Sequence, residues 1–140
     1  MKLTAGSLQP GVRWLGRAAA SAGLGGVAAA TVMWLFIMFW DESGAGLGSL
    51  FGLLVFIWII PVIALGTLPV AIVGAIMTRL GAGAFVFALT GLSGGVAAAI
   101  LMNGIHHLPI ADPLSFLMVV PAGIVSMPTF WYLEQAAANA

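Results

Sequence analysis

Two adjacent histidines and a nearby aspartate are the side chains in this sequence best suited to chemistry. His106 and His107 offer imidazole nitrogens, and Asp112 could add a carboxylate as a third metal ligand if Pro109 turned the loop back. Adjacent histidines on a loop point in divergent directions, however, and a b-type haem needs axial histidines from two separate elements. We therefore predict an exposed loop and no bound metal or cofactor, with these three residues kept as the metal candidates.

Groups for other kinds of chemistry are missing from the sequence. The chain has no cysteine, which removes thiol redox chemistry and thiolate nucleophiles. No nucleophile, base and oxyanion donor occur near one another. No acidic, basic or histidine residue is expected to lie deep in the membrane, where a proton-coupled carrier or a carrier of charged substrates needs an ionisable group. The formal net charge of zero gives no indication of nucleic-acid binding. We therefore do not expect an enzyme.

The composition is that of a chain embedded in lipid. Charged residues make up 6% of its 140 residues, against roughly a quarter in soluble domains, and 62% are hydrophobic, with a mean hydropathy of +1.18. Charge-free stretches cover residues 18–40, 43–78, 80–111 and 113–133. A helix of about 20 apolar residues crosses a bilayer. The sequence thus predicts an all-α, polytopic membrane protein with four transmembrane helices in two tandem hairpins.

Local signals place the ends of the expected spans within a single transmembrane bundle over residues 1–140. The predicted spans cover about residues 18–40, 49–78, 82–103 and 113–133. Gly81 can take the left-handed conformation that ends the second helix, and Asp112-Pro113 can start the fourth as its N-cap and first residue. Residues 1–17, broken by Pro10-Gly11, are expected to lie at the headgroup level or to be disordered.

The distribution of charge predicts the orientation. All four cations fall on one side of a four-span arrangement, namely Lys2, Arg13, Arg17 and Arg79. The loops on the other side contain Asp41, Glu42, His106, His107 and Asp112. Because positively charged loops stay in the cytoplasm, both termini are expected there. We expect an integral protein of a bacterial cytoplasmic (inner) membrane.

Small residues suggest an internal repeat and a helix contact. The six letters of residues 25–30, GGVAAA, recur at residues 94–99, which indicates a duplication or simply the ease of matching Gly/Ala-rich sequence. Small residues four apart permit close approach of helices in lipid. Two such ridges consist of Ser21, Gly25 and Ala29 and of Gly91, Gly95 and Ala99. We expect the first and third spans to cross through these ridges, unless either ridge faces a partner subunit.

Prolines are expected to bend the second and fourth spans. They are Pro61, Pro69, Pro121 and Pro128, each of which removes a hydrogen bond within its helix. Such breaks expose carbonyl groups that bind ions in some transporters, but more often nearby hydroxyls satisfy them. Thr67, Ser126 and Thr129 are available for this purpose.

Two kinds of function remain. The first is a non-catalytic accessory or structural subunit of a larger integral membrane complex, which packs against other subunits and lipid through Gly/Ala-rich helix faces. The alternative is a small channel or uniporter that acts as a homo-oligomer, with proline-broken second and fourth helices forming the pathway.

Overall fold

The described residues of the protein form four α-helices. The structure is a computed structural model that describes residues 5–40, 47–110 and 112–140. Its helices are α1 (Ala5–Trp40), α2 (Leu47–Arg79), α3 (Ala84–Ile105) and α4 (Pro113–Ala138). The predicted all-helical fold is therefore confirmed.

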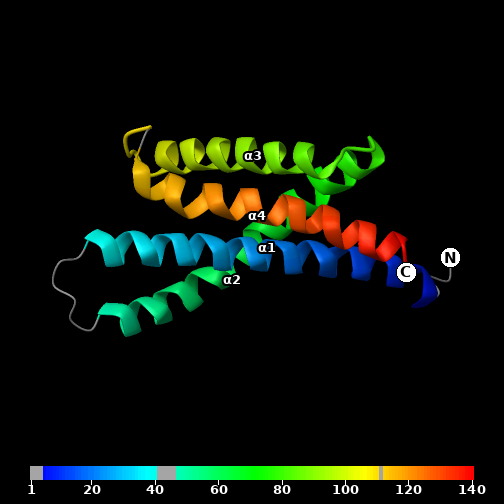
Figure 1. The fold of residues 1–140 in the computed structure, drawn as a ribbon, viewed down its shortest axis with the longest axis horizontal. Coiled ribbons are helices and arrows are strands. Elements are labelled where there is room, and N and C mark those ends of the chain that lie inside the picture. The colour runs from blue at the N-terminus through cyan, green and yellow to red at the C-terminus, as the bar shows by residue number, and fades with distance from the viewer. Residues whose placement is uncertain (1–4, 41–46, 111) are drawn as a thin grey trace.

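The helices form an open row rather than a closed bundle. Along this row α3 packs on α4, α4 packs on α1, and α1 packs on α2, which also touches α4. Successive helices run in opposite directions, so the start of α1 and the end of α4 lie at the same end of the molecule (Figure 1). Within the described part of the chain, α2 and α3 are not packed along each other.

The outer faces of the helices are apolar, as expected for contact with lipid. Side chains such as Leu68, Phe85 and Ile105 are 60%, 74% and 66% exposed. The described segments Gly11–Phe36, Ala84–Ile105 and Pro113–Ala138 are long and apolar enough to cross a membrane, and Ile63–Arg79 of α2 is a shorter apolar helix. Exposed apolar surface on this scale promotes aggregation in water, whereas in a bilayer it contacts lipid tails. The chain thus has the features of an integral membrane protein.

The ends of α2 and α4 are set by short-range interactions that the sequence predicts. Asp112 caps α4 by accepting a hydrogen bond from the Leu114 backbone N–H at 3.3 Å, and Pro113 is the first helical residue. After α2, Gly81 has a φ of 69°. The Ala82 N–H donates to the Met77 carbonyl, which completes a Schellman motif.

The main apolar core lies where all four helices converge, near the end that holds the chain termini. Phe87 of α3 and Phe130 of α4 are fully buried there. Ala18, Val70, Ala71 and Met127 complete this cluster. Gly74 of α2 makes room for the Phe130 ring, because a Cβ at residue 74 would overlap the ring carbons. The helices are therefore fastened together at one end.

The start of α1 differs from expectation. α1 begins at Ala5 and runs through Pro10-Gly11 without the predicted break, since a proline near a helix start disturbs only the first turns.

The prolines of α2 and α4 lie inside continuous helices. The Thr67 hydroxyl bonds to the Ile63 carbonyl and that of Thr129 to the Val125 carbonyl, which are not the groups that the prolines free. The backbone freed by proline is thus not satisfied by these two hydroxyls.

Candidate functional site

α3 and α4 approach each other closely through glycines. A Cβ added at Gly91 would overlap the Gly123 carbonyl oxygen, and one added at Gly123 would overlap the Gly91 carbonyl oxygen. Gly95 lies one turn further along, where a Cβ would come within 2.9 Å of the Val120 Cα. The two backbones therefore touch directly, which only glycine permits.

The small-residue ridge of α1 packs on another face of α4, next to the face that meets α3. A Cβ at Gly25 would lie 3.0 Å from the Ser126 Cβ and against the Ala122 carbonyl. Ser21 and Ala29, on the same face, are also buried. Ser21 donates to the Arg17 carbonyl at 2.7 Å, so its hydroxyl is satisfied within α1. α4 is thus held between two faces rich in small residues.

This arrangement corrects the expected crossing of the first and third spans. The ridge of Ser21, Gly25 and Ala29 and the ridge of Gly91, Gly95 and Ala99 do not meet, because α4 lies between them (Figure 1). Each instead has a partner in α4, where Ala122-Gly123 presents a small-residue face on both sides.

The two GGVAAA copies take different places in the structure. Gly25 is the first residue of one copy and is buried against α4, whereas Gly94, the first residue of the other, is exposed. A Cβ added at Gly94 would meet nothing within 4 Å. The repeated letters therefore do not correspond to equivalent packing positions, and the duplication stays a prediction.

A long apolar groove lies between α2 and α3, which form its two edges. It has a volume of about 740 Å³, and its floor is formed by α1 and α4. Small residues line much of it, including Gly26 and Ala30 on α1 and Gly94 and Ala98 on α3. Pro61 and Pro69 face it from α2. The groove is thus an apolar depression between the helices. Because many of its lining side chains are small, the helix backbones lie close to the open space.

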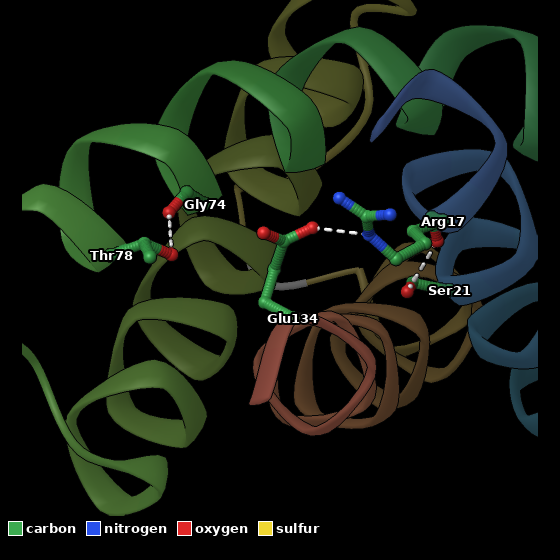
Figure 2. A network of polar contacts seen from close by, with 5 residues as sticks. All are labelled: Arg17, Ser21, Gly74, Thr78 and Glu134. Carbon is green, nitrogen blue, oxygen red and sulfur yellow. Dashed lines mark hydrogen bonds and ion pairs between the residues drawn. The ribbon is translucent and has the colours of Figure 1, made fainter. Parts of the chain in front are cut away.

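A half-buried ion pair lies at the end of the molecule where the helices converge. The Arg17 Nε of α1 donates to the Glu134 Oε1 of α4 at 2.5 Å, and the two side chains are 27% and 18% exposed. Figure 2 shows Glu134 between Arg17 and Thr78, whose hydroxyl donates to the Gly74 carbonyl at 2.8 Å. A cavity of about 390 Å³ opens beside Glu134. The ion pair thus joins the first helix to the last.

The histidine loop lies at the opposite end and is shaped by backbone hydrogen bonds. His107 has a φ of 54°, and the Leu108 N–H donates to the Asn103 carbonyl at 2.8 Å, so His107 occupies the left-handed position that ends α3. His106 and His107 are both exposed. Over residues 5–40, 47–110 and 112–140, no three histidine, cysteine or acidic residues gather as a metal site.

A fully buried asparagine holds this loop in place. The Asn103 amide nitrogen donates to the Ile110 carbonyl at 2.9 Å, and its oxygen accepts from the Ser115 hydroxyl at 2.5 Å. These bonds connect α3, the loop and the first turn of α4. The loop is thus positioned by Asn103.

Three residues that matter in the structure were absent from the sequence analysis as site residues. Glu134 directly follows the charge-free stretch of residues 113–133 and is the single acidic residue on the side of the predicted spans that carries the arginines. Ala122 and Gly123 directly follow Pro121 in the fourth predicted span. The lone acid and the adjacent small residues were the available signals.

Comparison of the chain with protein-family models, with curated proteins and with solved structures finds no match.

Proposed function

We propose that this protein is a non-catalytic subunit of a larger integral membrane complex and that it holds a membrane helix of a partner subunit in the groove between α2 and α3. The observation that carries this proposal is the open space beside Gly94. Gly94 lies on the wall of the groove, is exposed, and has open space where a side chain would be. The ridges through Gly25 and through Gly91 and Gly95 already pack on α4, whereas the open side of Gly94 meets no other part of the described chain.

A partner helix is the occupant that best fits the lining of the groove. Lipid tails adapt to any apolar surface and gain little from glycine in particular. A helix gains dispersion contacts and weak Cα–H hydrogen bonds when small residues allow its backbone to approach closely. Ala30 on α1 and Gly94 and Ala98 on α3 provide such an approach from two sides of the groove.

Substitution of Gly94 tests the proposal. Gly94→Leu fills the groove wall without touching the fold, so the partner subunit that co-purifies with the wild-type protein in mild detergent should be lost. Gly104→Leu is the matched control, because Gly104 is an exposed glycine of the same helix with open space around it and lies outside the groove. The measurement is the molar ratio of partner to this protein after affinity purification.

Other outcomes would contradict the partner-helix proposal. Partner retention by Gly94→Leu would exclude the groove as the docking surface, and release of lipid alone would make it a lipid site. The alternative function, a homo-oligomeric channel or uniporter, predicts solute flux from the purified protein in liposomes. A reproducible flux sensitive to Pro69→Ala would replace the subunit proposal.

We further propose that the helices form two tandem hairpins with both termini in the cytoplasm of a bacterial cell. The positive charges of Arg13, Arg17 and Arg79 support this orientation. Because the chain has no cysteine, a single cysteine can report on each end. His106→Cys should react with an impermeant thiol reagent added to intact cells, and Asn139→Cys should not. The reverse labelling would invert the orientation.

A further inference from the structure

The cavity beside the ion pair is separate from the groove and has a different character. Its volume is about 390 Å³, and α1, α2 and α4 contribute to its wall. The lining residues are Trp14, Ala75, Thr78, Arg79 and Glu134. An indole, a hydroxyl, a guanidinium and a carboxylate thus face one small space at the end of the bundle.

The charged residues around this cavity have a net charge of one positive unit, since Arg17 and Arg79 are cationic and Glu134 is anionic. Arg17 neutralises Glu134 through their hydrogen bond. Arg79, in the last turn of α2, has no carboxylate partner within the described segments of the chain. The cavity therefore favours a ligand with one negative charge, and no unpaired carboxylate remains to attract a cation.

The sequence places the three charged residues at one level relative to the membrane. Arg17 immediately precedes the charge-free stretch of residues 18–40, Arg79 follows that of residues 43–78, and Glu134 follows that of residues 113–133. Each is the first charge outside an apolar span, which is the depth of the lipid phosphates. The Trp14 indole suits the same interface.

We propose that this cavity binds the phosphodiester of an anionic phospholipid headgroup. A phosphodiester carries a single negative charge, and the planar guanidinium of Arg79 can donate two parallel hydrogen bonds to its oxygens. Trp14 packs against the glycerol portion of the headgroup. A net anionic lipid such as phosphatidylglycerol is preferred to zwitterionic phosphatidylethanolamine, because Glu134 is already paired with Arg17 and does not bind the ammonium group.

The test is a binding titration of the full-length protein in mild detergent, followed by native mass spectrometry. The probes are dihexanoyl phosphatidylglycerol, phosphatidylethanolamine with the same chains, the matching diacylglycerol without phosphate, and inorganic phosphate. Phosphatidylglycerol should bind most tightly. Loss of its hydrogen bonds to a charged group in Arg79→Gln should weaken binding about tenfold. Arg79→Lys, which keeps the charge but not the paired donors, should fall between the two.

Arg13→Gln is the matched control, since Arg13 is an exposed arginine of α1 outside the cavity. It should bind phosphatidylglycerol like the wild-type protein. Equal loss in Arg13→Gln and Arg79→Gln would show a diffuse surface attraction and overturn the site. Equal binding of diacylglycerol would also overturn it, and tighter binding of inorganic phosphate would make a soluble anion the ligand. Helix content, measured by circular dichroism, identifies a variant that has unfolded. None of these outcomes depends on a partner helix in the groove.

Discussion

Replacing Gly91 with alanine is expected to destabilise the protein by roughly 1–3 kcal/mol, because the added methyl group overlaps the Gly123 carbonyl and forces α3 away from α4. Membrane helices have no hydrophobic force to restore that contact once the backbones separate. The measurement is the unfolding free energy in mixed micelles, followed by far-ultraviolet circular dichroism.

The same substitution three residues further along α3 should have the opposite sign. Gly94→Ala meets nothing within 4 Å, so only the helix propensity changes, which favours alanine by up to about 1 kcal/mol. The two variants share a helix and a chemical change, and they differ in what the methyl group meets. Equal effects at residues 91 and 94 would show that α3 and α4 do not meet as described.

Removing either member of the ion pair is expected to be the second large effect. Arg17→Gln leaves Glu134 charged and half-buried without its partner, and Glu134→Gln does the same to Arg17. Each single variant should lose roughly 1–3 kcal/mol of stability, the usual cost of leaving a buried polar group unsatisfied. The loss should appear as a lower unfolding midpoint in the same mixed micelles.

A double-mutant cycle separates the free energy of the Arg17–Glu134 interaction from the effects of removing each side chain alone. The variant with both Arg17→Gln and Glu134→Gln should be more stable than the sum of the single losses predicts, because no uncompensated charge remains. Arg13→Gln, at an exposed position of the same helix, should change stability little. Additive losses would mean that the Arg17–Glu134 contact does not contribute as a pair.

The sequence predicted the elements of this fold better than their arrangement. The starts and stops at Asp112-Pro113 and Gly81 were predictable because capping depends on residues adjacent in the chain. The third span was predicted to end near residue 103, but α3 runs to Ile105 and the left-handed residue is His107, because backbone hydrogen bonds rather than residue type decide that position. Local chemistry therefore placed these boundaries to within a few residues.

The sequence did not predict which helix packs on which. Similar Gly/Ala ridges on the first and third helices gave no indication that each packs on α4, since a small-residue face fits any other such face. Glu134 directly follows the last charge-free stretch, and only the three-dimensional structure brings it to Arg17, 117 positions away in the chain. The candidate site thus depends on long-range contacts that periodicity does not encode.

The groove between α2 and α3 is open along the sides of these helices, so in a membrane it would face the lipid. The bundle is fastened at the end that contains Phe87 and Phe130, while α2 and α3 do not close over the space between them. A partner helix would enter by lateral diffusion in the plane of the bilayer, after both proteins have been inserted. Binding and exchange of that partner would then require no helix of this chain to leave the membrane.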